Sequence, residues 1–137
     1  MNGYLLDTNI VTAHLKKNPL VRRRLRNAEI AGHPVMLNAI SYYETRRGLL
    51  FAGAHEQLRA FEQLWQALGI VMIDQAVLDK AAEIYAALRK TGQLIEDADI
   101  LIAAIAIIHD MTLVTNNTAH FIRIPDLHLE DWLVPPA

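Results

Sequence analysis

Short apolar runs alternate with longer stretches of helical periodicity along this sequence of 137 residues. The runs are bounded by polar residues, glycine or proline, as expected of short buried strands. The longer stretches begin and end at capping residues, such as Asp74 before one and Gly69 after another. Because parallel strands need a crossover between them, the alternation predicts an α/β fold with helices on both faces of a mostly parallel sheet.

The predicted elements fill the chain without a linker, an internal repeat or a low-complexity segment, so we expect residues 1–137 to form a single domain. A hydrophobic content of 53% with 20% charged residues fits a compact soluble fold. We expect four to five short strands, at residues 4–6, 35–37, 70–73, 113–115 and 127–129. The expected helices cover residues 9–15, 20–29, 56–68, 75–90 and 97–109, and a further helix opens at Ser41.

Several classes of protein are disfavoured by composition. The sequence has no cysteine, which rules out disulfides and thiolate metal sites and is compatible with a reducing cytoplasm. We find no signal-peptide pattern at the start. The longest apolar run, Ile100 to Ile108, is too short for a membrane span of roughly 20 residues. We therefore expect a cytoplasmic protein with no membrane partner.

Acidic and amide residues stand at the predicted carboxyl ends of strands or at the starts of the helices that follow. In a parallel sheet these ends share one edge, so residues far apart in the sequence converge there. Carboxylates in close contact need a compensating charge, and Mg²⁺ or Mn²⁺ suits oxygen ligands. No histidine pair stands at zinc-ligand spacing. The residues concerned are Asp7, Glu44, Asp97, Asp99, Asn116 and Asn117.

Each of these positions also has a purely structural interpretation. Asp7 could cap the following helix, and Ser41 with Glu44 has the spacing of a capping box. Asp97 and Asp99 suit the first turn of a helix, where its dipole favours negative charge. The two asparagines could simply form a turn. The conjunction argues for a site, because the structural interpretation must hold independently at every strand end.

Several short motifs follow one another in a fixed order along the whole chain. They are Leu5-Leu6-Asp7-Thr8-Asn9, Ser41-Tyr42-Tyr43-Glu44, Asp99-Ile100-Leu101-Ile102-Ala103-Ala104, Leu113-Val114-Thr115-Asn116-Asn117, and the closing Phe121, Pro125, Leu127 and Glu130-Asp131-Trp132. In these motifs the sequence resembles the PIN-domain proteins, and more closely the VapC-type toxins of bacterial toxin–antitoxin pairs. The resemblance covers essentially the whole chain, and its motifs are specific together although each one is short. It implies a three-layer α/β/α PIN-like domain.

The resemblance also implies roles for individual residues. Asp7 and Asp99 match the principal metal ligands, and Glu44 matches the acid that binds metal directly or through water. Asn116 stands where many PIN domains have a fourth acid, which leaves open whether one or two metal ions bind. Whether Asp97 takes part also stays open. The expected supporting residues are Thr8, Asn9, Thr115, Asn116, Asn117 and Asp97.

By this resemblance the chain is a Mg²⁺- or Mn²⁺-dependent endoribonuclease that acts as a toxin. Its expected substrate is single-stranded or looped RNA cut to leave 5′-phosphate ends, with transfer RNA the favoured target and messenger and ribosomal RNA open. The expected partners are a cognate antitoxin and a second copy of the chain, in a homodimer or a larger toxin–antitoxin assembly. The alternative is a catalytically weakened PIN-like module that binds RNA or protein. A nonspecific DNA nuclease is disfavoured.

Basic residues are concentrated in the first third of the chain. Residues 1–50 contain eight Lys and Arg against three Asp and Glu, although the whole chain carries a net charge of −2. We predict that Arg46 and Arg47, on the helix of Glu44, contact RNA phosphates. Arg22 and Arg26 are predicted to contact either RNA or an acidic antitoxin segment. A solvated helix face is the structural alternative.

Overall fold

The computed structural model describes residues 3–135, so the first two and the last two residues of the predicted 1–137 domain lie outside the described part. Five strands, all paired in parallel, form one sheet in the order β3-β2-β1-β4-β5. This confirms the predicted α/β fold with a central parallel sheet. The strands are β1 (Tyr4–Leu6), β2 (Val35–Asn38), β3 (Ile70–Val71), β4 (Thr112–Val114) and β5 (Leu129–Glu130).

The crossovers between the strands are helical, which is what a parallel sheet requires. Two helices follow each of the first three strands, and one short helix follows β4. The helices are α1 (Thr8–Leu15), α2 (Pro19–Ile30), α3 (Ala39–Ala52), α4 (His55–Leu68), α5 (Gln75–Lys90), α6 (Asp97–Ile108) and α7 (Thr118–Phe121).

The strands are apolar on both faces because helices cover both sides of the sheet. Successive side chains of a strand point to opposite faces. In β1, Leu5 packs in the cluster formed with α5 and α6, whereas Leu6 packs in the cluster formed with α1 and α2. Leu113 and Val114 of β4 divide in the same way. These two clusters are the cores of a three-layer α/β/α arrangement.

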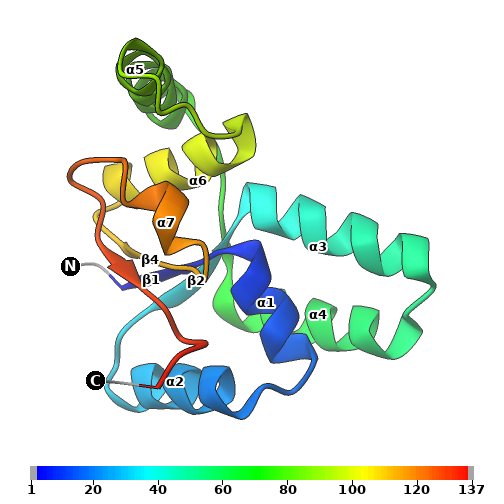
Figure 1. Ribbon diagram of the computed structural model, residues 1–137. Coiled ribbons are helices and arrows are strands. Elements are labelled where there is room, and N and C mark those ends of the chain that lie inside the picture. The colour runs from blue at the N-terminus through cyan, green and yellow to red at the C-terminus, as the bar shows by residue number, and fades with distance from the viewer. Residues whose placement is uncertain (1–2, 136–137) are drawn as a thin grey trace.

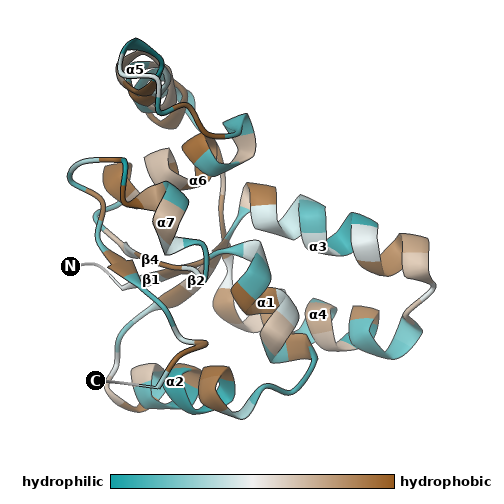
Figure 2. Ribbon diagram, in the orientation of Figure 1, coloured by the Kyte–Doolittle hydropathy of each residue, from teal (hydrophilic) through white to brown (hydrophobic). Residues whose placement is uncertain are grey.

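The layers can be followed in Figure 1, where α5, α6 and α7 lie on one side of the sheet and α2 lies on the other. Helices α3 and α4 form a hairpin that extends sideways from the sheet, with α1 beside its base. Figure 2 shows that α6 is largely apolar, in keeping with its place between the sheet and α5. The polar start of α6 therefore stands out against an apolar helix.

Several predicted strand boundaries were wrong. Strand β3 ends at Val71 instead of Ile73, because it is an edge strand that pairs only with the last two residues of β2. Strand β5 begins at Leu129, where its pairing with β4 begins, instead of at Leu127. Strand β4 ends at Val114, one residue before the predicted end. Sequence periodicity does not register how far a neighbouring strand extends.

The predicted capping box at Ser41 and Glu44 was also wrong. Helix α3 begins at Ala39, and Asn38 caps it by accepting a hydrogen bond of 2.8 Å from the Ser41 backbone N–H. A buried strand therefore runs directly into the helix, and the end of that strand supplies the cap. The Glu44 side chain is free for another contact.

The carboxyl ends of the central strands lie side by side at one edge of the sheet. The Asp7 backbone N–H donates to the Val114 carbonyl, 2.9 Å away, which fixes the end of β1 against the end of β4. Helices α1, α3 and the loop before α7 all begin at this edge. Within residues 3–135, no helix is both long and apolar enough to cross a membrane.

Candidate active site

An open cavity of about 540 Å³ lies at the carboxyl edge of the sheet. Its walls come from the end of β1, from α1, α3 and α6, and from the segment around α7. Four of its side chains are acidic, and a cation would offset the repulsion between their charges. The lining residues are Asp7, Thr8, Asn9, Thr12, Glu44, Glu96, Asp99, Asn117 and His120.

Asp7 is the buried carboxylate of the cavity, with 5% of its surface exposed. It is the N-cap of α1, and its Oδ1 accepts a hydrogen bond of 2.7 Å from the Thr8 backbone N–H. Its Oδ2 accepts a hydrogen bond of 2.8 Å from the Thr115 hydroxyl at the end of β4. Asp7 therefore caps α1, as its structural interpretation predicts, and its carboxylate also lines the cavity. The carboxylate is fixed in place by the end of one strand and the start of a helix.

Glu44 is held at the cavity by a row of polar side chains that starts at Asn38. The fully buried Asn38 amide donates to the Leu6 carbonyl and to the Ser41 hydroxyl, 2.9 Å in each case. The Ser41 and Thr8 hydroxyls lie 2.9 Å apart, and Thr8 donates to Glu44 Oε1 at 2.7 Å. Because a hydroxyl has one proton, Thr8 gives its proton to Glu44 and Ser41 donates to Thr8. The row fixes the β1 end, α1 and α3 together.

Asp99 faces Asp7 from the first turn of α6. Its side chain is 21% exposed, and no side chain or backbone group of residues 3–135 donates a hydrogen bond to its carboxylate. Its neighbour at the rim is the His120 imidazole, whose Nδ1 lies 3.9 Å from Asp99 Oδ2. The Asp99 carboxylate is therefore positioned by its helix and left open to the cavity.

The carboxylates of the cavity affect each other's ionisation. Burial, and then the charges of Asp7 and Glu96, raise the pKa of Asp99 to about 6, and the neighbouring His120 opposes this. Burial also raises the pKa of Asp7, with a contribution from Glu44, while the hydrogen bonds from Thr115 and Thr8 lower it. Such mutual repulsion is relieved when a cation binds among the carboxylates.

A loop after β4 completes the wall opposite α3. The buried Thr115 hydroxyl, which donates to Asp7, also accepts a hydrogen bond of 3.0 Å from the Asn117 backbone N–H. The Asn117 amide nitrogen lies 2.9 Å from His120 Nδ1 in α7. A continuous set of contacts therefore runs from the Asp7 carboxylate to the His120 ring at the rim.

The PIN domain family matches residues 4–127, which include every residue of the cavity. The chain belongs to the PIN-domain family. It is 34% identical to Ribonuclease VapC1 of Methanocaldococcus jannaschii, over 92% of this chain and 84% of that protein. It is 28% identical to the tRNA(fMet)-specific endonuclease VapC of Shigella flexneri, over 96% of this chain and 99% of that one.

A solved structure shows the same PIN fold. The chain superposes on a chain of the VapBC2 complex from Rickettsia felis, crystallised with a DNA fragment from the promoter, with a TM-score of 0.85 and 30% identity. The match covers 94% of this chain and 98% of the other. The likeness thus extends over the full fold, including the elements that build the cavity.

Most of the predicted catalytic, metal-binding and supporting residues of this PIN domain meet at the cavity, but three do not line it. Thr115 is buried and reaches the site through its hydrogen bond to Asp7. Asp97 is exposed at the first position of α6 and points elsewhere than Asp99. Asn116 is also exposed; its backbone N–H donates to Asn9 Oδ1 and its amide donates to Asp131 Oδ2. The residue of this asparagine pair that reaches the cavity is Asn117.

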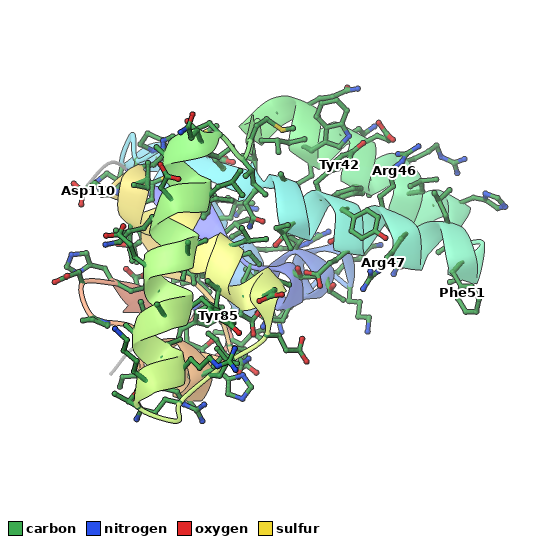
Figure 3. The ribbon with its side chains drawn as sticks, turned by 90° about the horizontal axis from the view of Figure 1, so that it is seen from above. Tyr42, Arg46, Arg47, Phe51, Tyr85 and Asp110 are labelled. Atoms are coloured by element: carbon green, nitrogen blue, oxygen red, sulfur yellow. The ribbon has the colours of Figure 1, made fainter. Side chains whose placement is uncertain are left out.

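The four arginines predicted to contact RNA lie outside the cavity lining. Arg46 forms an ion pair with Glu62 of α4, and Arg47 lies over the Tyr43 ring with its guanidinium carbon 5.0 Å from the ring centre. Figure 3 shows Arg46 on the side of α3 that faces α4 and Arg47 on a different side of the same helix. Arg22 and Arg26 are exposed on α2.

The aromatic residues of the α3–α4 hairpin divide between core and surface. Tyr42 packs on Phe61 and Trp65, with ring centres 5.6 and 5.8 Å away. Tyr43 is 60% exposed and Phe51 is 95% exposed. Figure 3 shows Phe51 at the far end of the hairpin, away from the sheet.

Sequence reasoning missed four residues of the site. Glu96 precedes Asp99 by three positions, a helical spacing that places both on one face, and this signal was readable. Thr12 follows Thr8 by four positions in the same way. Asn38 ends an apolar strand and could have been recognised as a cap. His120 had no readable signal, because its place depends on how α7 folds back.

Proposed function

We propose that this chain is a metal-dependent endoribonuclease that acts as the toxin of a toxin–antitoxin pair. The observation that carries the proposal is that Asp7 and Asp99, 92 positions apart in the sequence, face one cavity closely enough to raise the pKa of Asp99. An acidic cavity of this kind needs a cation before a phosphodiester can enter. The relatives of M. jannaschii and S. flexneri carry the names of ribonucleases.

The side chains of the cavity fit Mg²⁺ or Mn²⁺ by donor type. Asp7, Asp99 and Glu44 would hold the ion, because all three offer carboxylate oxygens, and no cysteine exists to favour a softer metal. Among residues 3–135, no three acidic or histidine side chains already converge on one point. The exposed face of Asp99 has no hydrogen-bonding partner in the described chain and is free to turn toward an ion beside Asp7.

When bound, such an ion lowers the pKa of a coordinated water and offsets charge on the leaving 3′ oxygen. The protein's own contribution is placement. Thr115 and the α1 backbone hold Asp7, while Thr8 holds Glu44. Asp99, in the first turn of α6, supplies a carboxylate from the opposite wall of the cavity. Thr8, Asn9 and Asn117 give polar groups around the carboxylates, where they can orient water and phosphate oxygens.

We infer transfer RNA as the favoured substrate, because the S. flexneri relative is named for one transfer RNA and is similar over almost its whole length. A cognate antitoxin is the proposed protein partner, because the R. felis structure is that of a VapBC complex. We further propose that the single PIN domain acts as a homodimer or within a larger toxin–antitoxin assembly, in the cytoplasm, where RNA is available.

The test is cleavage of total cellular RNA by purified, antitoxin-free protein with Mg²⁺ or Mn²⁺. We expect discrete fragments that disappear with EDTA and with the Asp99→Asn variant. Asp97→Asn is the matched control, because Asp97 lies in the same helical turn but outside the cavity. Sequencing the fragment ends would identify the RNA and the cleaved bond, and parallel single-stranded DNA would test the choice of RNA.

The second candidate is a PIN-like module that binds RNA or protein without cutting it. Two observations favour it: the carboxylates of residues 3–135 do not converge on one ligand point, and Asn116 replaces the expected fourth acid. Intact RNA after incubation with folded, metal-loaded protein would support this module and contradict the nuclease.

A further inference from the structure

His120 is the one side chain with a basic nitrogen among the residues that line the acidic cavity. It stands at the rim with its side chain 48% exposed, opposite four carboxylates that repel a phosphodiester. The arginines of α2 and α3 lie outside the lining. Among the lining residues, His120 therefore offers the one basic side chain that a substrate phosphate in this cavity can contact.

The contact with Asn117 determines which ring nitrogen of His120 carries a proton. The Asn117 amide nitrogen, 2.9 Å from His120 Nδ1, can only donate, so Nδ1 accepts. In the neutral ring the proton is then on Nε2. No group of residues 3–135 forms a hydrogen bond with Nε2. The neutral imidazole thus presents a free N–H donor on the side of the ring away from Asn117.

The ring is held in this position by the protein's interior. The next residue, Phe121, is fully buried and anchors α7 in the core cluster. The Asn117 backbone N–H donates to Thr115, which in turn donates to Asp7. The donor at the rim is therefore fixed relative to the buried carboxylate, and a fixed donor loses little conformational entropy when a ligand binds.

We propose that His120 is a substrate-positioning residue, which donates a hydrogen bond from Nε2–H to a phosphate oxygen of the bound RNA strand. The inference rests on the proposed ribonuclease function and adds a residue to it. His120 Nδ1 accepts its hydrogen bond from the Asn117 amide. Its distance of 3.9 Å from Asp99 Oδ2 is too long for a hydrogen bond, so the Asp99 carboxylate stays open to the cavity. One ring thereby joins the loop after β4 to the substrate.

Two conservative replacements separate this role from a purely structural one. In His120→Gln the terminal amide lies near the position of Nε2, so a donor at that position is kept. In His120→Asn the shorter side chain offers an acceptor near the position of Nδ1, so only the contact with Asn117 is kept. His120→Ala removes both groups. His55→Ala is the matched control, since His55 is an exposed histidine at the start of α4, in the α3–α4 hairpin.

The measurement has two parts. Steady-state cleavage of an oligoribonucleotide that carries the mapped cleavage site gives KM and kcat. Fluorescence anisotropy gives the affinity of the non-cleaving Asp7→Asn protein for a short labelled single-stranded RNA, with and without each His120 substitution. Asp7→Asn is chosen because it leaves the Asp99 and His120 side chains unchanged. Circular dichroism checks the fold of each variant.

We expect His120→Ala to raise KM and the RNA dissociation constant about fivefold, with kcat changed less than about twofold, as for loss of a hydrogen bond to a charged group at a half-exposed site. His120→Gln should restore most of the loss, and His120→Asn should not. Rescue by Asn in place of Gln, or unchanged binding in His120→Ala, would overturn the inference. If the wild-type protein neither binds nor cuts RNA, both the proposed function and this inference are contradicted. If the wild type is active and His120→Ala has the same KM and RNA affinity, the inference alone is contradicted.

Discussion

The two walls of the cavity hold their carboxylates in different ways. Asp7 is buried, caps α1 and accepts hydrogen bonds from the Thr8 backbone and the Thr115 hydroxyl. Asp99 is more exposed, accepts no hydrogen bond from residues 3–135, and has its pKa raised to about 6. One carboxylate is built into the scaffold, and the other is placed by a helix and left for a ligand.

The difference shows how a fold can hold a site in place while one of its carboxylates has no hydrogen-bond donor from the protein. On the Asp7 wall, the site residues are also structural residues, because Asn38, Ser41 and Thr8 join two strand ends to two helix starts. On the Asp99 wall, burial and the charges of Asp7 and Glu96 raise the pKa of Asp99, and His120 offsets this only in part. Substitutions on the first wall should therefore cost stability as well as activity, and substitutions on the second should cost activity alone.

The largest expected effect is that of Asp99→Asn on RNA cleavage. Removing this carboxylate should lower cleavage on the order of a thousandfold, because the proposed metal ligand and its charge are lost. The melting temperature at pH 7 should stay equal or rise, because a repelled carboxylate is replaced by a neutral amide. Cleavage assays and thermal denaturation measure the two effects. A large fall in melting temperature would contradict the contrast between the walls.

On the opposite wall, Thr115→Val should lower stability. It removes the hydroxyl that donates to the buried Asp7 carboxylate and accepts from the Asn117 backbone, so buried polar groups lose their partner. The expected loss in the free energy of unfolding is about 1–3 kcal/mol, measured by urea denaturation. Thr12→Val is a suitable control, because Thr12 lines the same cavity on α1. Equal stability of the two variants would show that the clamp on Asp7 is dispensable.

The pH dependence of stability should separate the walls further. The pKa of Asp99 in the folded protein is about 6, above its ordinary value of 3.8, so the folded state binds the proton more tightly than the unfolded state. Stability from this group is therefore gained as pH falls from 7 through 6 toward 4, and lost as pH rises. Between pH 7 and 5 the gain should be about 1 kcal/mol. Measuring the free energy of unfolding against pH for the wild type and for Asp99→Asn isolates this contribution. The same pH dependence in both proteins would contradict the raised pKa of Asp99.

The smallest expected effect concerns the arginines of α3, which lie outside the cavity lining. Arg46 is paired with Glu62, whereas Arg47 lies over the Tyr43 ring and forms no ion pair within residues 3–135. Arg47→Gln should weaken RNA binding about twofold and reduce its salt dependence, and Arg46→Gln should weaken it less. Anisotropy titrations at two salt concentrations measure this. A larger effect at Arg46 would place the RNA path on the α4 side of the hairpin.

The fold was predictable because its determinants are local. Apolar runs at Tyr4–Leu6 and Val35–Leu37, separated by capped helices, suffice to predict a parallel sheet and the edge at which Asp7 lies. Boundaries such as the end of β3 were less predictable, because they depend on how far β2 extends beside it.

The site was predictable where a residue's position follows directly from a strand end, as for Asp7 and Thr115. It was less predictable where contacts between residues distant in the sequence determine the position of a side chain. The Ser41–Glu44 spacing suggested a capping box, but Asn38 provides the cap and Glu44 turns to Thr8 on another helix. The place of His120 depends on the packing of Phe121 after the strand, which no local pattern reveals.

The most direct test of the central claim is calorimetric titration of Mn²⁺ into the wild-type protein and into Asp7→Asn, Asp99→Asn and Asp97→Asn. If Asp7 and Asp99 hold one ion between the two walls, each of their variants should bind Mn²⁺ at least about tenfold more weakly, because a ligand is lost. Asp97→Asn should bind like wild type. Equal affinity in all four proteins would contradict the claim that these two carboxylates form a metal site.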